Sequence, residues 1–431
     1  MDVKDLYNKK LLSIPEAVKL VKSNQGIGVA MAGSEPPGLL GALGSRKDEV
    51  ESVSVITTLT LKPYDFFSKP EMRGHFLMET WFYGEPARAA HQYGTVSLIP
   101  SNLGEAGRKR AQFNPPDIFW GTATPMDKFG YFSLSLGVTY EKILLRSAKM
   151  VVLEINENLP RTLGDTMVHI SEVDYVVENT CPLVELPVVE PSPEDIAVGN
   201  YIADLIEDGS TIQLGIGGIP NAITRSLMDK KDLGVHTEMF TDGMVDLYHA
   251  GVITGRQKTL WPEKMVGTFA LGTKKLYDFI DDNLAVEFQQ GYITNSPEII
   301  AKNHKMVSIN TSLQIDLTGQ CCSESLGAIQ YSGAGGQSDT QRGAQMSPGG
   351  KAFIALRSTA RKGTVSTIVP QLTPGAYVTL NRMDVDYVVT EHGVAHLKGR
   401  CVRDRAKALI SIAHPDFRGG LRKEAERLRL W

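Results

Sequence analysis

Two segments of this chain recur in the same order, and this internal repeat constrains the fold more than any other feature. Ser13–Glu16 opens an apolar-periodic helix that leads through a turn into a strand at 27–31. Ser192–Asp195 opens a second such helix, followed by a turn and a strand at 211–214. A serine three residues before an acidic side chain is typical of a capped helix start. The repeat predicts two halves that begin with the same helix–turn–strand unit.

A second match supports the first. The segment Val173–Val177 reads Val-Asp-Tyr-Val-Val, and the same five residues recur at Val385–Val389. Both have the pattern of a buried strand. Further strands are predicted at 53–61, 96–99, 118–120, 150–155, 285–288 and 306–309, and helices at 11–22, 87–91, 297–303 and 404–412.

This alternation of strands and helices favours parallel sheets with helices on both faces. The expected fold class is α/β, with two related domains that each contain a mainly parallel sheet flanked by helices. A length of 431 residues also exceeds what one core normally organises. The stretch 183–193 is too rich in proline for a regular element, so we place the linker there. The predicted domains are 1–187 and 188–431.

Composition excludes several classes of partner. The net charge is −4 and no basic stripe with interleaved aromatic residues occurs, which argues against a nucleic-acid partner. The first residues lack an apolar signal core, and no run approaches the length of a membrane span, so a cytoplasmic protein without a membrane partner is expected. The four cysteines, Cys181, Cys321, Cys322 and Cys401, lack the spacing of metal ligands and are expected to be buried or incidental thiols.

A glycine cluster follows the second-half strand. Gly215–Pro220 lacks the third spaced glycine of a dinucleotide fingerprint, where Pro220 stands, and it lacks the Gly-Lys-Ser/Thr of a P-loop. The matching first-half loop also carries Gly33 and Gly38, so part of the pattern belongs to the scaffold. Clustered glycines let a ligand reach backbone N–H groups at a helix start. A structural turn and a phosphate-binding loop both fit this pattern.

Glu238 lies inside 235–240, which is predicted to be the next strand. In an open parallel sheet, the end of this strand would face the crevice where ligands bind. Burying a carboxylate in such a strand costs folding free energy unless the carboxylate is paired or has a function. A catalytic and a structural role are both open for Glu238. For neighbouring His236, a satisfied hydrogen bond is favoured over acid–base work.

Other polar positions carry weaker signals. His392 and His396 have an interrupted His-x-x-x-His spacing with no third ligand, so a structural role is favoured over a metal site. Arg342, Lys351 and Arg357 follow the glycine-rich segment 327–339 and fit surface charges or phosphate contacts. The glycine-rich segment itself predicts a functional or tightly turned loop.

Four segments taken together carry a resemblance. They are 213–222, 236–243, 331–337 and 390–395. In these segments the chain resembles the acetyl-CoA hydrolase/transferase family, and within it the 4-hydroxybutyrate CoA-transferases, over essentially its full length. The resemblance implies a tandem of CoA-transferase-like domains, with the catalytic glutamate and the CoA loop in the second.

The resemblance also assigns residues. It places the catalytic glutamate at Glu238 and implies coenzyme A as substrate and covalent intermediate, with no permanently bound cofactor and no metal. The Gln213 amide and a backbone N–H near Gly335–Gly336 are candidate oxyanion donors. The positions expected to bind CoA are Gly215, Ile216, Gly217, Gly218, Ile219, Leu313, Ser332 and Gly336.

The implied reaction moves CoA between a short-chain acyl-CoA and a carboxylate of the 4-hydroxybutyrate, butyrate or acetate class, by a ping-pong route through a glutamyl-CoA thioester. The expected partners are these substrates and further copies of the chain in a homo-oligomer. Two alternatives stay open: an acyl-CoA hydrolase on the same scaffold, and a non-catalytic protein that binds a phosphorylated metabolite. A dehydrogenase is disfavoured because a complete fingerprint with its acidic partner is missing.

Overall fold

Residues 2–431 are described by a computed structural model, and the chain divides into two compact units. Unit 1 runs to Leu186 and also contains Val266–Thr294, whereas unit 2 comprises Pro187–Met265 and Asn295–Trp431. The predicted domains, 1–187 and 188–431, were drawn from the internal repeat and stay a prediction. The compact units differ from them because the segment Val266–Thr294 belongs to unit 1. Hydrogen bonds explain this difference, since Thr268 O accepts from Val138 N at 2.9 Å and Gly291 N donates to Thr139 O at 2.9 Å.

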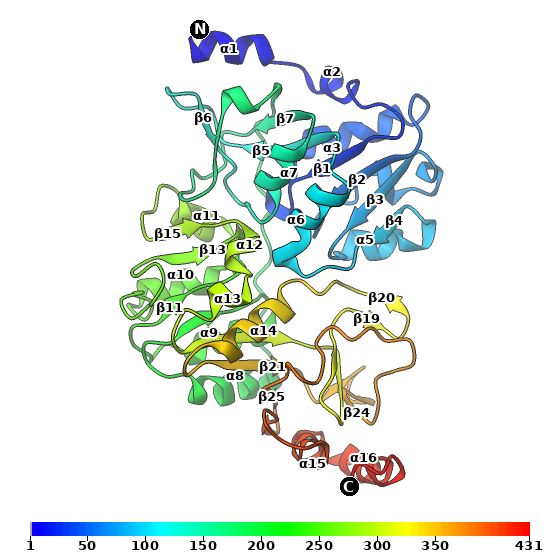
Figure 1. Cartoon of the computed structure of the whole chain (residues 1–431), viewed down its shortest axis with the longest axis vertical. Helices are drawn as coiled ribbons and strands as arrows, with labels where there is room; N and C mark the ends of the chain where they lie inside the picture. The colour runs from blue at the N-terminus through cyan, green and yellow to red at the C-terminus, as the bar shows by residue number, and fades with distance from the viewer. Residues whose placement is uncertain (1) are drawn as a thin grey trace. The chain divides into compact units, whose positions relative to one another are not determined.

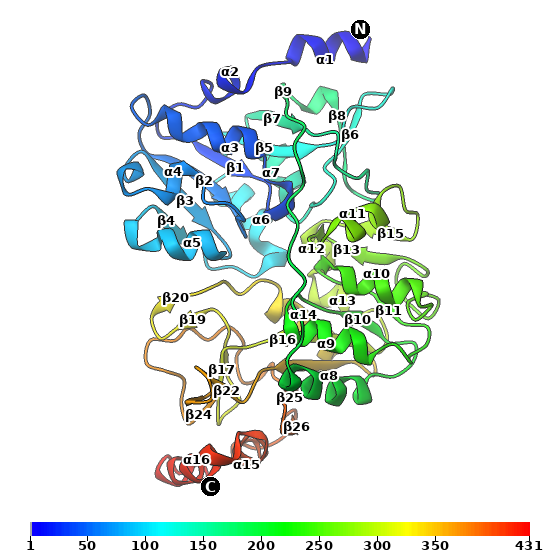
Figure 2. The same cartoon turned by 180° about the vertical axis from the view of Figure 1, so that it is seen from behind.

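Unit 1 is built on a parallel sheet of seven strands in the order β4-β3-β2-β1-β5-β7-β9. The strands are β1 Gly26–Val29, β2 Val53–Thr57, β3 Phe76–Thr80, β4 Val96–Leu98, β5 Ile118–Ala123, β7 Met150–Ile155 and β9 Tyr175–Glu178. Helices α6 (Leu103–Phe113) and α7 (Glu141–Ser147) lie in front of this sheet in Figure 1, and α3 (Pro37–Leu43) lies in front in Figure 2. Helices therefore cover both faces, as the alternating pattern predicted.

Unit 2 contains a six-stranded sheet in the order β11-β10-β16-β21-β25-β26, parallel except for the last pair. Its strands are β10 Thr211–Gln213, β11 Gly234–Val235, β16 Met306–Thr311, β21 Lys351–Ala355, β25 Tyr387–Thr390 and β26 Gly393–His396. Helices α8 (Pro193–Leu205) and α9 (Gly218–Ser226) lie on the face seen in Figure 2, and α14 (Gln337–Met346) lies on the face seen in Figure 1. Each unit is thus an α/β domain with a mainly parallel sheet.

The internal repeat is present in the topology. Strand β9 stands three places from β1 in unit 1, and β25 stands three places from β10 in unit 2. The aspartate of each Val-Asp-Tyr-Val-Val segment makes the same contact: Asp174 accepts from Val151 N at 2.8 Å, and Asp386 accepts from Ala352 N at 3.2 Å. The prediction of two related α/β halves is confirmed down to this hydrogen bond.

Some predicted boundaries were wrong. The helix expected at 11–22 is only α2, Ile14–Val18, and the strand expected at 53–61 ends at Thr57. Leu59 adopts a left-handed backbone with φ +50°, which no strand continues through. The stretch 179–192, which covers the predicted linker except Pro193, has no helix or strand and runs as an extended ribbon in Figure 2.

A buried acid lies where the first strands of unit 1 end. Glu35 follows β1, is 5% exposed, and its carboxyl accepts a hydrogen bond from Thr57 Oγ1 at 3.4 Å. Burial raises the pKa of Glu35 to about 8, although hydrogen bonds from Thr60 and Leu61 N act in the opposite direction. Glu35 is therefore mostly protonated at pH 7, whereas in the unfolded chain it would be ionised.

This shift predicts that the stability of the protein falls as pH rises from about 5 to 8. Within that window, unfolding releases the Glu35 proton, so each pH unit lowers the unfolding free energy by up to about 1.4 kcal/mol. Glu35→Gln mimics the protonated acid and removes this contribution. We expect the variant to gain in thermal midpoint over the wild type at pH 8 and to show little difference at pH 5.

Thermal unfolding at several pH values between 5 and 8 checks this, with the exposed Glu71→Gln as the matched control. The two variants change the same functional group, and only one of the two side chains is buried. A difference between Glu35→Gln and wild type that stays constant across the pH range would contradict the prediction.

Candidate active site

Gln213 and Glu238 emerge at the same edge of the unit 2 sheet. Strands β10 and β11 are parallel neighbours, with Ile212 opposite Val235. The strand predicted at 235–240 was wrong, because β11 ends at Val235 and the next strand, β12, covers only Met239–Phe240. Glu238 lies in the gap between them, just beyond the carboxyl end of β11. In parallel α/β sheets, that edge is where ligands bind.

The Glu238 carboxylate is held by two donors. Asn295 Nδ2 donates to Glu238 Oε2 at 3.1 Å, and the backbone N–H of Gly336 donates to the same carboxyl. Gly336 is the N-cap of α14, so the carboxylate also lies at the positive end of that helix. Burial raises the pKa of Glu238, and the hydrogen bonds from Asn295 and Gly336 oppose that rise. The result is a poorly hydrated but oriented carboxylate.

The amide of Gln213 has a fixed orientation. Its Oε1 accepts from Ser308 Oγ and from Ile309 N, both at 3.1 Å. The Nε2 group therefore faces the other way, and it has no partner among residues 2–431. Gln213 is 5% exposed, so a donor of this kind is available without reorganisation at the sheet edge.

The glycine loop leaves the start of α9 open. Gly217, the N-cap residue, has φ +114°, and no side chain caps the helix. Around Gly215 and Gly217 an added Cβ would meet nothing within 4 Å. The N–H groups at the start of α9 are thus accessible to a ligand, and they carry the partial positive charge that favours an anion.

The first half of the repeat fills the equivalent position with its own carboxylate. Glu154 accepts from Gly38 N and Leu39 N at the start of α3, each at 2.9 Å. Glu154 pairs with Val177, and Ala355 pairs with Val389. Val177 and Val389 end the two Val-Asp-Tyr-Val-Val segments, so Ala355 is the counterpart of Glu154 in the second half. Alanine supplies no carboxylate there, and the carboxylate that does lie beside Gly218, that of Asp195, is paired with Arg357.

One of the basic residues singled out from the sequence lies beside this loop. Arg357 makes a bidentate pair with the buried Asp195, at 2.8 and 2.7 Å, and a Cβ on Gly218 would run into that same carboxylate. Although burial opposes it, the Arg357 guanidinium holds the pKa of Asp195 below its usual range. Lys351 instead binds Leu205 O, where β21 begins, at 2.9 Å.

The remaining positions predicted to bind CoA are only partly brought together. Gly336 touches Glu238 directly. Leu313 N donates to Cys322 O at 3.1 Å and Ser332 Oγ donates to Ser323 O at 3.0 Å, so both attach to the same segment. Hydrogen bonds do not connect either of them to Glu238 in the described part of the chain.

Among residues 2–431, no group of three or more His, Cys, Asp or Glu side chains is placed to hold a metal ion. His396 Nε2 lies 3.1 Å from Asp386 Oδ1, inside the repeat contact described above. A helix long and apolar enough to cross a membrane is likewise missing from the described residues.

Comparison with known proteins identifies the family. The model of the acetyl-CoA hydrolase/transferase N-terminal domain matches residues 1–190, and that of the C-terminal domain matches 272–425. The chain belongs to the acetyl-CoA hydrolase/transferase family. It is a CoA-transferase enzyme, because relatives that align with it over nearly their whole length are named CoA-transferases.

Two of these relatives are similar over almost the full length. One is the succinyl-CoA:cyclohexane-1-carboxylate CoA transferase of Geobacter metallireducens, 45% identical over 98% of this chain and 96% of that protein. Another is the 4-hydroxybutyrate coenzyme A transferase of Clostridium kluyveri, 44% identical over 98% of this chain and 99% of that protein. Among solved structures, RipA from Yersinia pestis is 40% identical and superposes with a TM-score of 0.95 over 100% of both chains.

Sequence reasoning about this transferase missed Asn295. It precedes the capped helix α13, Pro297–Ile300, and was not singled out. The residue is 1% exposed and its amide reaches Glu238. A buried asparagine just before a helix was the only local signal, and that signal does not reveal a partner 57 residues earlier in the chain.

Asn295→Ala is expected to raise the pKa of Glu238, because a hydrogen bond to the charged form is lost. The acid limb of the kcat/KM profile should move to higher pH, with activity partly recovered in alkaline buffer. Ser296→Ala is the matched control, since it removes the bond to Ile299 N without touching Glu238. Equal pH profiles for Asn295→Ala and wild type would contradict the prediction.

Proposed function

We propose that the enzyme moves CoA between a short-chain acyl-CoA and a carboxylate of the 4-hydroxybutyrate, butyrate or acetate class, through a thioester between Glu238 and CoA. The observation that carries the proposal is the Glu238 carboxylate, held by Asn295 and Gly336 at the sheet edge that also presents the open start of α9. A nucleophile and an anion site thus share one edge of one sheet.

In the first step, a Glu238 oxygen attacks the carbonyl carbon of the acyl-CoA thioester. The C–S bond breaks, and the products are a mixed anhydride and the CoA thiolate. Negative charge develops on the carbonyl oxygen during the attack, and Gln213 Nε2 is the donor that we assign to it. A carboxylate is a weak nucleophile, so holding it in line is the main contribution of the protein, worth about 7–11 kcal/mol in favourable cases.

In the second step, the thiolate attacks the glutamyl carbonyl of the anhydride. The anhydride C–O bond breaks, the original acyl group leaves as a free carboxylate, and Glu238 becomes the CoA thioester. An acceptor carboxylate then runs both steps in reverse and leaves as the new acyl-CoA. Atoms and charge balance without any oxidant, reductant or water.

The rest of the CoA molecule is assigned to the glycine loop. We place a phosphate of CoA against the N–H groups of Gly217–Ile219, with Arg357 beside it, and we keep Gly215, Ile216, Leu313 and Ser332 as proposed CoA contacts. Binding energy from this remote half offsets the cost of positioning the thioester. Homo-oligomerisation and a cytoplasmic location stay predictions.

The test is chemical trapping. The protein is incubated with acyl-CoA alone, treated with hydroxylamine or borohydride, and mapped by mass spectrometry. A CoA-sized adduct before treatment, and a modified Glu238 peptide after it, are expected. Turnover of acyl-CoA and acetate with Glu238 unmodified at every time point would sink the proposal.

A panel of donors and acceptors settles the substrate class. Acetate, butyrate and 4-hydroxybutyrate are compared as acceptors, together with the alicyclic carboxylate that the Geobacter relative is named for. Preference for one of the first three supports the proposed class. Rapid thioester loss without any added carboxylate would instead show a hydrolase, in which water resolves the glutamyl intermediate.

A further inference from the structure

A basic pocket lies on unit 1, and none of its lining residues belongs to the proposed catalytic centre. Its volume is about 560 Å³, and it lies among α6, α7 and the short helix α12, Gly291–Thr294. Its lining residues are Arg108, Ala111, Gln112, Lys142, Ile143, Arg146, Gln290 and Tyr292. Three of them are cationic and none is acidic, in a chain whose net charge is −4. A concave basic surface of this kind is not a consequence of overall composition.

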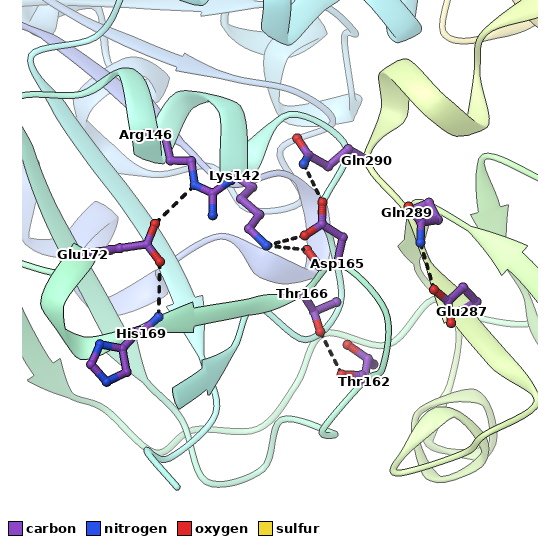
Figure 3. Close-up of polar contacts among 10 residues, drawn as sticks. All are labelled: Lys142, Arg146, Thr162, Asp165, Thr166, His169, Glu172, Glu287, Gln289 and Gln290. Atoms are coloured by element: carbon purple, nitrogen blue, oxygen red, sulfur yellow. Dashed lines mark hydrogen bonds and ion pairs between the residues drawn. The ribbon is translucent and has the colours of Figure 1, made fainter. Parts of the chain in front are cut away.

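The charge of Arg108 is not compensated by the protein. Its guanidinium stacks over the ring of Tyr292 at 3.8 Å from the centroid, and it has no acidic partner among residues 2–431. Arg146 lies one turn along α7 from Lys142. It forms an ion pair with Glu172, whose carboxylate also accepts a hydrogen bond from the backbone N–H of His169 (Figure 3). A planar guanidinium presented on an aromatic ring is well suited to a phosphate group.

Two of the lining residues, Lys142 and Gln290, are held by Asp165. Lys142 and Gln290 are 6% and 5% exposed, and Figure 3 shows both directed at this carboxylate. Lys142 forms an ion pair with Asp165 Oδ1, and Gln290 Nε2 donates to Oδ2 at 2.5 Å. The Oε1 atom of Gln290 therefore faces away from Asp165, and it has no hydrogen-bond partner among the described residues. Gln290 Oε1 is thus a buried acceptor of a lining residue that no described protein group satisfies.

The walls are packed closely enough to keep this geometry. A Cβ on Gly107 of α6 would clash with Tyr140, which precedes α7. Gly291 of α12 is likewise in tight contact with Thr139, to which it donates a backbone hydrogen bond of 2.9 Å. The three helices are thus fixed against one another, and the cationic groups are arranged before any ligand arrives.

We propose that this pocket binds a phosphorylated nucleotide. Phosphate oxygens would be held by Arg108 and Arg146, and a hydroxyl or amine of the same ligand, directly or through a water, would supply the donor that Gln290 Oε1 lacks. Two ligands share this chemistry: a free nucleotide such as ADP, and the 3′,5′-bisphosphate nucleotide that ends coenzyme A. Binding here involves no covalent step.

Direct binding to the full chain tests the proposal. Titration calorimetry is run with 3′,5′-ADP, ADP and inorganic pyrophosphate, without acyl-CoA, on the wild type and on Arg108→Ala and Arg146→Ala. We expect saturable binding of at least one nucleotide, weakened about tenfold by each substitution. Lys109→Ala is the matched control: it removes an equal charge from the same exposed helix surface outside the pocket lining, and should change affinity less than about twofold.

Competition separates the two sources. If 3′,5′-ADP binds and CoA displaces it, the ligand is the nucleotide end of CoA; if ADP binds and CoA does not displace it, the ligand is a free nucleotide. The proposal is overturned if neither nucleotide binds saturably up to millimolar concentration, or if Lys109→Ala weakens binding as much as Arg108→Ala. Because no turnover is measured, failure here leaves the Glu238 mechanism unaffected.

Discussion

Glu238→Gln is expected to lower kcat for CoA transfer by at least about 10³-fold. The amide keeps the volume of the side chain and can still accept from Asn295 Nδ2 and the Gly336 N–H, so the site should stay assembled. What is lost is the charged oxygen that forms the anhydride. Transfer assays with saturating acyl-CoA and acetate measure the loss, and calorimetry with free CoA should show affinity within a few-fold of wild type.

The exposed Glu298→Gln on α13 serves as the control for this substitution. It makes the same change of charge within unit 2, at a side chain that lies on the surface, and should leave kcat unchanged. If Glu238→Gln kept kcat within tenfold of wild type, another group would have to be the nucleophile and the thioester route would be wrong.

The repeated architecture was predictable because its signals are local. The Val-Asp-Tyr-Val-Val segments are short buried strands in both units, and the two capped helix starts before β1 and β10 are visible as Ser-Pro-Glu-like patterns. Strand ends were less predictable. The strand-like alternation after β2 continues to Leu61, yet Leu59 has a left-handed backbone and the strand ends at Thr57. A hydrophobic pattern contains no information about that dihedral angle.

The membership of Val266–Thr294 in unit 1 could not be predicted either, for a different reason. It depends on backbone hydrogen bonds such as Val138 N to Thr268 O, which join residues far apart in sequence. Backbone groups are identical in every residue type, so pairings of this kind leave no trace in side-chain periodicity. The proline-rich linker marked only the first point at which the chain leaves unit 1.

For the candidate site, the reactive residues could be predicted from the sequence, whereas their hydrogen-bond partners could be identified only in the structure. Glu238 and the glycine loop stood out by residue type, whereas the role of Asn295 depends on a contact across 57 positions. The orientation of Gln213 depends in the same way on Ser308, a serine in the neighbouring strand β16. Comparison of the two halves adds what neither half shows alone: Glu154 closes one helix start, and Ala355 leaves the other open.

Gly336 gives the most direct test of how tightly Glu238 is held. A Cβ at this position would overlap both Glu238 Oε2 and Asn295 Nδ2. The backbone of Gly336, at φ −94° and ψ 13°, is accessible to alanine, so the substitution introduces no strained dihedral. The two atoms that would have to move are the ends of flexible side chains, and moving them costs little folding free energy.

Gly336→Ala is therefore expected to separate stability from activity. The thermal midpoint should stay within about 2 °C of wild type, while kcat falls at least about 100-fold because the carboxylate is pushed out of line with the thioester. Gly420→Ala on α16 (Pro415–Arg427), where an added Cβ meets nothing within 4 Å, should leave both quantities unchanged. A Gly336→Ala enzyme with normal kcat would show that the carboxylate reacts from a position other than the one held by Gly336 and Asn295. A variant that unfolds early would show that the overlap is relieved through the backbone, and the account of a rigidly placed but locally adjustable nucleophile would then be wrong.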